Sequence, residues 1–256
     1  MSIKSKVLAA AASLTLVGGL GAGALVTAGA ANAATPSCGN QCIDIFSHQF
    51  GTFANPNFVM DVYKQQQAVG APIILFRTSN SDPAEDFTIS DQGSVADFFA
   101  AGLVSSAVAL HYGCIPGVNF PNCNTAVNDE AFEFEYAPFG ADTGLCVGVP
   151  STAVSGTKVA LEPCGVSSKT VWILDTLDQQ FTTAWAHGYI PLINGSDTNF
   201  SQPFVLTYPN QSFPTDKPRP QLVVTNLTGF SFHVGNLFGT GANSDQLWGA
   251  TFGELK

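Results

Sequence analysis

A short apolar pattern occurs three times along the chain, at nearly constant internal spacing. From the second residue of each apolar run, a leucine follows after 15, 14 and 14 residues, and an aromatic residue comes 12, 11 and 11 residues later. A unit of this size cannot bury its apolar face alone. The pattern therefore predicts one folding unit used three times in a pseudo-threefold β structure. The copies are Val59-Met60-Asp61-Val62 with Leu75 and Phe87, Cys146-Val147-Gly148-Val149 with Leu161 and Trp172, and Leu222-Val223-Val224-Thr225 with Leu237 and Trp248.

The first 33 residues have the features of a secretory signal peptide of bacterial appearance. Lys4 and Lys6 precede a run rich in Ala, Leu, Val and Gly, and Ala31-Asn32-Ala33 supplies the small residues of a cleavage site. A membrane anchor is the alternative, but glycine and alanine dilute the run. We expect a secreted, extracellular product of residues 34–256, with no later segment in the membrane.

The mature chain is strongly acidic. Residues 34–256 hold seven basic and nineteen acidic residues, which gives a net charge of −12. Nucleic acids and anionic membranes bind surfaces with clustered Lys and Arg, so neither is expected as a partner. Only 11% of residues in the full chain are charged, and 11% are aromatic, which is typical of a folded globular protein.

All six cysteines lie in the mature region, where an oxidising compartment favours disulfides. Six cysteines allow 15 pairings, and the sequence leaves the choice open. Proximity favours Cys38–Cys42, Cys114–Cys123 and Cys146–Cys164, and the repeat register supports the last pair best. Zinc sites often contain a C-x-x-C pair, and this chain has none, so no metal is expected. No cofactor is expected either.

Frequent Gly and Pro divide the chain into short runs rich in Val, Ile, Phe and Thr, which is typical of an all-β protein. Phe132–Tyr136 alternates strictly between aromatic residues and glutamates, so the pattern predicts a strand with Glu133 and Glu135 on a solvated face. The segment 95–110 is ambiguous between helix and strand, and we expect a strand pair broken near Gly102. Core packing is the expected role of the repeated leucines and aromatic residues.

The repeats also carry a family likeness. An apolar strand ending C-[LV]-x-V, a second strand near a cysteine and the closing Gln246-Leu247-Trp248, a Q-x-W motif, resemble the ricin B-type lectin β-trefoil. The resemblance implies an all-β, pseudo-threefold β-trefoil-like fold over residues 34–256, with repeats at about 43–90, 130–175 and 203–252. The pair Cys146 and Cys164 also looks like the family's intra-repeat disulfide. Copies 76 to 87 residues apart exceed the family's usual repeat length, so long inter-repeat loops are expected. A β-sandwich with chance repeats is the alternative.

The sugar site of that family implies an Asp in the first strand, an aromatic platform and a polar residue near the Q-x-W. The first repeat keeps Asp61, offers Phe76 as the ring, and has Glu85 in place of Gln. The acidic group 82–86 lacks the spacing of a calcium loop. In the second repeat Gly148 replaces the Asp, and in the third Val224 stands at the expected position. Asp61, Phe76 and Glu85 are therefore the candidate ligand-binding residues.

No catalytic motif occurs in the mature chain: G-x-S-x-G, H-E-x-x-H, Walker A and G-x-G-x-x-G are all absent. We expect a non-catalytic, lectin-like binding module whose partner is an extracellular glycan. The alternatives are a secreted hydrolase with a loop-built site and a trefoil-type protease inhibitor that uses a loop such as Gln211–Pro220.

Overall fold

The structure is a computed structural model, and its described residues all lie within the compact unit Thr35–Lys256. The expected signal peptide, residues 1–33, and most of the loop Gln211–Pro220 lie outside them. No helix among the described residues is long and apolar enough to span a membrane. The structure describes residues 38–79, 82–112, 114, 130–174, 189–198, 202–209, 219–228, 230–233, 236–239 and 244–252.

By their pairing, twelve of the described strands form three equivalent sets of four. The first set is β1 (Ile43–Ser47), β2 (Phe58–Val62), β3 (Ile73–Arg77) and β4 (Phe87–Ser94). The second is β5 (Glu130–Tyr136), β6 (Leu145–Gly148), β8 (Ala160–Pro163) and β9 (Val171–Leu174). The third is β10 (Ile193–Asn194), β11 (Phe204–Thr207), β12 (Val223–Asn226) and β15 (Trp248–Phe252).

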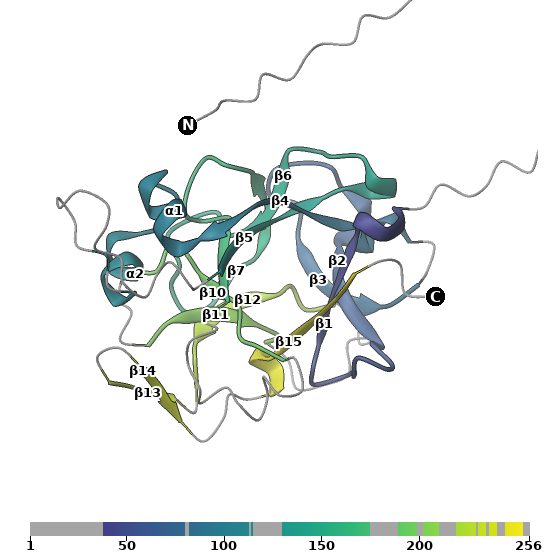
Figure 1. The fold of residues 1–256 in the computed structure, drawn as a ribbon. Coiled ribbons are helices and arrows are strands. Elements are labelled where there is room, and N and C mark those ends of the chain that lie inside the picture. Colours follow the sequence, from purple (N-terminus) through teal and green to yellow (C-terminus); the bar gives the residue numbers. More distant parts are fainter. Residues whose placement is uncertain are drawn as a thin grey trace, which may run out of the picture. The chain divides into compact units, whose positions relative to one another are not determined.

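The outer strands of each set close into a six-stranded antiparallel barrel. Around the ring, β1 pairs with β4, β4 with β5, β5 with β9 and β9 with β10. A bridge between Ile190 and Trp248 joins the third set, and β15 pairs with β1 along five residues. Figure 1 shows the last strand beside the first. Closure of this ring is incompatible with the alternative of a β-sandwich.

The inner strands of each set form three hairpins, β2–β3, β6–β8 and β11–β12. A ring of backbone hydrogen bonds ties them together: Ile73 N donates to Val159 O (3.1 Å), Val159 N to Leu222 O (2.8 Å) and Leu222 N to Ile73 O (2.8 Å). Each hairpin thus makes the same contact with the next. A six-stranded barrel closed by three such hairpins is a β-trefoil, and this ring marks its pseudo-threefold axis.

The strand register confirms two of the predicted repeats and corrects the third. Met60 faces Leu75 and Val147 faces Leu161, as expected, but the equivalent pair in the third set is Leu206 and Val224. The run Leu222–Thr225 is therefore the second strand of its hairpin. The third repeat begins near Ile190 rather than at 203, and the side chain of Leu237 lies outside the described ones.

The predicted core positions are otherwise confirmed. Leu75, Leu161, Phe87, Trp172 and Trp248 are all buried in one cluster that fills the barrel and the inner face of the hairpins. Their burial follows from strand alternation, which turns every second side chain toward the axis.

The segment 95–110 is helical, so the predicted strand pair is wrong. Helix α1 (Val95–Ala100) starts at a capping box, in which Ser94 Oγ accepts from Asp97 N at 3.2 Å and Asp97 Oδ2 accepts from Ser94 N at 3.1 Å. Gly102, with φ of +76°, follows its end. Helix α2 (Ser106–His111) starts at Ser105. Their apolar faces pack on the outside of the barrel against residues of β9, β10 and β11.

Three further elements extend the repeats. The short strand β7 (Thr157–Lys158) pairs with β12. The hairpin of β13 (Phe230–His233) and β14 (Asn236–Gly239) lies between β12 and β15 in the sequence. Single 3-10 turns precede or follow strands at η1 (Gly39–Gln41), η2 (Tyr63–Gln65), η3 (Pro83–Glu85), η4 (Pro138–Gly140) and η6 (Ser244–Gln246).

Candidate functional site

The candidate ligand residues of the first repeat share the outer face of the hairpin β2–β3. Asp61 lies opposite Ile74 in the strand pair, and Phe76 lies two residues further along β3. Because cross-strand partners point to the same side of a sheet, these three side chains point away from the side that carries Met60 and Leu75. The structure therefore brings Asp61 and Phe76 to one face.

Glu85 reaches the same region from turn η3. Asp82 caps this turn by accepting from Ala84 N at 3.0 Å, and Pro83 follows the cap. The Glu85 carboxylate accepts from Ser79 N at 3.0 Å and from Thr78 Oγ1 at 3.2 Å. Glu85 is only 4% exposed. Its direct role is to hold the loop that follows β3.

Asp61, Asp82 and Glu85 each place a carboxylate oxygen within 4.8 Å of the others. Burial raises the pKa of Asp61 to about 7; the charge of Asp82 adds to this effect and that of Arg219 opposes it. Burial also raises the pKa of Glu85 to about 8, against the hydrogen bond from Ser79 and together with the charge of Asp61. Near neutral pH this group holds bound protons, so it can both donate and accept hydrogen bonds.

A buried phenol lies near these acids. Tyr136, at the end of β5, is fully buried, and its hydroxyl has no hydrogen-bond partner among the described residues. Burial raises the pKa of Tyr136 above its ordinary value, and the charges of Asp61, Asp86 and Asp82 raise it further. The phenol is therefore a neutral donor at physiological pH.

Arg219 covers the candidate stacking ring. Its guanidinium carbon lies 3.7 Å from the centroid of the Phe76 ring, which is a cation–π contact. Its Nε is buried and has no hydrogen-bond partner among the described residues. No sequence pattern connects Arg219 with Phe76, because they lie 143 positions apart and in different repeats. A ligand that stacks on this face of Phe76 must take the place of the guanidinium.

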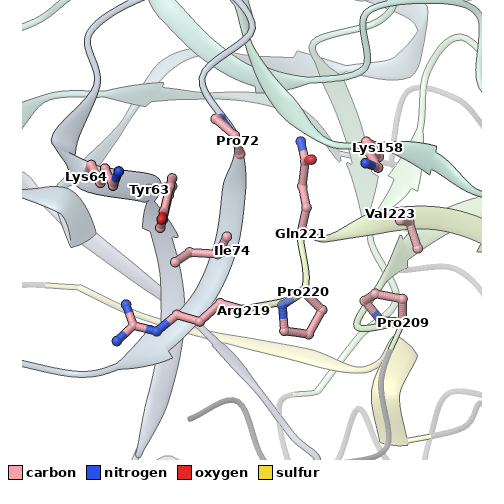
Figure 2. A pocket seen from close by; sticks show the side chains of 10 residues that line it. All are labelled: Tyr63, Lys64, Pro72, Ile74, Lys158, Pro209, Arg219, Pro220, Gln221 and Val223. Atoms are coloured by element: carbon pink, nitrogen blue, oxygen red, sulfur yellow. The ribbon is translucent and has the colours of Figure 1, made fainter. Parts of the chain in front are cut away.

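An open groove of about 970 Å³ adjoins this face (Figure 2). Figure 2 shows Ile74 and Arg219 on one side, and Gln221 and Val223 on the other. The groove therefore lies between residues of the first and third repeats, and Lys158 of the second repeat completes its lining. Its lining is Tyr63, Lys64, Pro72, Ile74, Lys158, Pro209, Arg219, Pro220, Gln221 and Val223.

The equivalent position in the second repeat is closed. Gly148 occupies the place of Asp61, and Glu162 that of Phe76. A Cβ atom on Gly148 would lie 2.8 Å from Thr170 Cγ2 and 3.0 Å from Lys169 O. The second repeat has no space for the missing carboxylate, which agrees with the expectation from its sequence.

The equivalent position in the third repeat is occupied by internal hydrogen bonds. Thr207 takes the place of Asp61 and Thr225 that of Phe76, so the expected comparison with Val224 used the wrong strand. Gln246 Oε1 accepts from Thr228 N at 2.9 Å, while its Nε2 donates to Thr225 Oγ1 and to Asn226 O, both at 2.9 Å. The glutamine of Q-x-W thus has a structural role here, with neither carboxylate nor aromatic ring beside it.

The glutamates of β5 are buried, so the predicted solvated face is wrong. Glu133 is 1% exposed and accepts from Gly165 N at 3.0 Å and from Thr170 Oγ1. Glu135 accepts from Gly144 N. Both carboxylates are used to hold loops of the second repeat, and neither borders the groove.

Disulfides join Cys146 to Cys164 across the hairpin β6–β8, and Cys38 to Cys42 near the start of β1. Cys114 is also disulfide-bonded. Its expected partner, Cys123, lies outside the described residues.

No protein-family model matches the chain, and no curated protein matches it either. Solved structures that resemble it include the designed three-fold symmetric protein ThreeFoil, with a TM-score of 0.47 and 12% identity over 82% of this chain and 97% of that protein. The β-trefoil lectin of the Vibrio vulnificus hemolysin/cytolysin, solved with N-acetyl-D-lactosamine bound, has a TM-score of 0.41 and 10% identity over 84% of this chain and 97% of that protein.

A third similar structure is the exo-β-1,3-galactanase 1,3Gal43A from Clostridium thermocellum. It has a TM-score of 0.46 and 9% identity over 83% of this chain, which spans 30% of that enzyme. The assignment of the β-trefoil fold to this chain rests on its own strand pairing, the closed barrel and the hydrogen-bond ring between the hairpins.

Proposed function

We propose that this chain is a secreted, non-catalytic carbohydrate-binding module with one sugar site, in the first repeat. The observation that carries the proposal is the pairing of Asp61 and Phe76 on one face beside an open groove, while neither of the other two repeats has a carboxylate at the position of Asp61 or an aromatic ring at that of Phe76. A carboxylate accepts hydrogen bonds from vicinal sugar hydroxyls, and an aromatic ring packs against the C–H face of a sugar.

In this proposal the sugar replaces the guanidinium of Arg219 on the ring of Phe76. Arg219 then moves away from a contact of the kind worth about 1 kcal/mol at partly exposed sites. Glu85 keeps the loop at Ser79 in place, as it does without a ligand. A single site of this kind binds weakly unless several copies act together.

The absence of catalysis is part of the proposal. Glycoside hydrolysis by two carboxylates needs them on either side of the scissile bond. Asp61 and Glu85 are both 4% exposed, and Glu85 is engaged with Thr78 and Ser79. Glu85 is therefore not free to act as the second carboxylate of such a pair. Turnover of glycans, esters or peptides that a single substitution abolishes would favour the hydrolase instead, and stoichiometric inhibition of a protease panel would favour the inhibitor.

A glycan array tests the proposal directly. Mature wild-type protein, Asp61→Asn and the control Asp142→Asn are applied to the same array, since Asp142 is an exposed aspartate that does not line the groove. Binding of at least one glycan by wild type and the control, with loss of that signal in Asp61→Asn, supports the site. Equal signals for all three proteins would remove Asp61 from it, and no binding by any would reject carbohydrate binding.

A further inference from the structure

The groove next to the candidate sugar site lies over the point where the three hairpins meet. Ile73, Val159 and Leu222 form the hydrogen-bond ring on the axis. The residues that flank them in the chain line the groove, namely Pro72, Ile74, Lys158, Gln221 and Val223. Because side chains alternate along a strand, these neighbours point away from the core side of the ring. The groove is therefore a property of the assembled trefoil, built from all three repeats.

Positive charge is concentrated in this groove. The mature chain has seven basic residues against nineteen acidic ones, yet Lys64, Lys158 and Arg219 all line the groove, and its lining holds no carboxylate. Among the described residues, neither Lys64 nor Lys158 takes part in an ion pair. Like charges in a lining that holds no carboxylate attract an anion.

The carboxylates nearest to the groove do not cancel its positive charge. Asp61 and Asp82 do not line the groove, and burial together with the charge of Asp82 raises the pKa of Asp61 to about 7, so that Asp61 is partly neutral at physiological pH. Arg219 opposes that rise with its own charge but still has a buried Nε with no acceptor. An oxyanion in the groove would supply acceptors that the described part of the protein does not.

The remaining lining suits a sugar ring. Tyr63 contributes an aromatic ring, and Pro72, Pro209 and Pro220 contribute apolar walls (Figure 2). Lys64 and Gln65 have φ of 57° and 55°, which residues other than glycine seldom adopt. A hydrogen bond of 3.0 Å from Gln65 Nε2 to Asp82 Oδ1 holds that turn. A volume of about 970 Å³ is at the upper end for small-molecule sites and has room for more than one ring.

We propose that the groove binds the negatively charged unit of an acidic saccharide, a sugar bearing a carboxylate or a sulfate, whose neutral neighbour occupies the Asp61 face. This inference rests on the proposed function and specifies its ligand class. Lys64 and Lys158, on opposite sides of the groove (Figure 2), attract the oxyanion, and Arg219, displaced from Phe76 by the neutral sugar, joins them. The protein then prefers charged glycans to neutral ones of the same backbone.

The test is an array of uronic-acid oligosaccharides, their uncharged methyl esters and sulfated galactose oligosaccharides. Each is measured with wild type, with the double variant Lys64→Gln/Lys158→Gln and with the control Lys169→Gln, whose lysine lies outside the groove. Both groove lysines are exposed, so folding should be unaffected. The expected result is affinity about tenfold higher for an acid than for its ester, lost in the double variant alone and weakened by salt. The class of charged glycan that binds identifies carboxylate or sulfate as the anion.

Two results would overturn the inference: equal binding of acids and esters by wild type, or an unchanged acid preference in the double variant. Ester binding that persists in the double variant but is lost in Asp61→Asn leaves the proposed function standing when this inference fails. If acidic glycans bind through the two lysines and Asp61→Asn changes nothing, the result supports the groove as an anion site. The same result rejects the Asp61 face as the site of the neutral sugar. An array with no signal rejects both.

Discussion

The indole nitrogen of Trp248 donates a hydrogen bond of 2.9 Å to the carbonyl oxygen of Leu206. Trp172 makes the same bond, of the same length, to Val147. In each case a buried aromatic residue of the outer barrel ties itself to the first strand of its own hairpin. The first repeat has Phe87 at this position, which has no donor for Met60. The shared bond shows that β11 is the first hairpin strand of the third repeat.

Replacing Trp248 with Phe should lower the free energy of unfolding by about 2–4 kcal/mol. The substitution leaves a buried carbonyl without its partner and removes part of a fully buried ring. Urea unfolding measures the effect. Phe87→Leu serves as a comparison, because it alters volume at the equivalent position without affecting a hydrogen bond. A loss below about 0.5 kcal/mol for Trp248→Phe would show that the bond does not matter.

Glu85→Gln should make the protein more stable at alkaline pH. Both Asp61 and Glu85 have folded-state pKa values, about 7 and about 8, above their ordinary values of 3.8 and 4.5. Between about pH 4 and 8 the folded state therefore holds more protons than the unfolded state, and stability from these groups is lost as the pH rises. Gln, the residue found at the equivalent position 246, keeps the acceptor for Ser79 and cannot ionise.

Unfolding of wild type, Glu85→Gln and the control Asp142→Asn at pH 5 and pH 8 gives the comparison. Glu85→Gln should exceed wild type at pH 8 by at least about 1 kcal/mol, the free energy of roughly one pKa unit, and by less at pH 5. Asp142→Asn should follow wild type at both. The account of the acidic group fails if Glu85→Gln is the less stable protein at pH 8.

Gly148→Ala should destabilise the protein by about 1–3 kcal/mol, as other overpacked sites do. The new Cβ would meet Thr170 Cγ2 at 2.8 Å and backbone at 3.0 Å. Gly93→Ala is the matched control, because its Cβ would make contacts of 3.5 Å that are ordinary. Gly148→Asp should therefore weaken the fold rather than create a sugar site in the second repeat. A Gly148→Ala protein as stable as Gly93→Ala would contradict the closed geometry.

Removal of the disulfide between Cys146 and Cys164 by a double substitution to Ser should cost about 2–4 kcal/mol. The bond links Cys146 in β6 to Cys164, which directly follows β8, and so closes the hairpin. Replacing both residues avoids a free thiol that could pair wrongly. Peptide mapping of the unreduced wild type should recover the two cysteines in one linked peptide pair, and either one found free or linked elsewhere would reject the pairing.

The sequence predicted the threefold β architecture because the leucines and aromatic residues of the first two repeats face the barrel axis and so keep their spacing. It missed the register of the third repeat for a physical reason. Val223 and Val224 look the same in a first or a second hairpin strand, and the true first strand, Phe204–Thr207, has neither the Asp nor the Cys of the other copies. The hydrogen bond of Trp248, which decides the register, is invisible in a sequence.

The two helices could have been predicted from their caps. Ser94 with Asp97 three residues later is a capping-box pattern, and Ser105 precedes a second apolar run. The candidate site was predictable only in part. Asp61, Phe76 and Glu85 could be chosen because all three belong to the first repeat and match positions of one motif. The contact of Arg219 with Phe76 and the groove depend on how the three hairpins meet, which no local pattern encodes.

The central claim is a single sugar site in the first repeat, and calorimetric titration of the strongest array ligand tests it most directly. Wild type at pH 8, where Asp61 is ionised, should bind one ligand per chain, and more weakly at pH 6 as the carboxylate takes up a proton. Asp61→Asn should show no binding at either pH. A stoichiometry of three per chain, or an Asp61→Asn titration that matches wild type, would contradict the account.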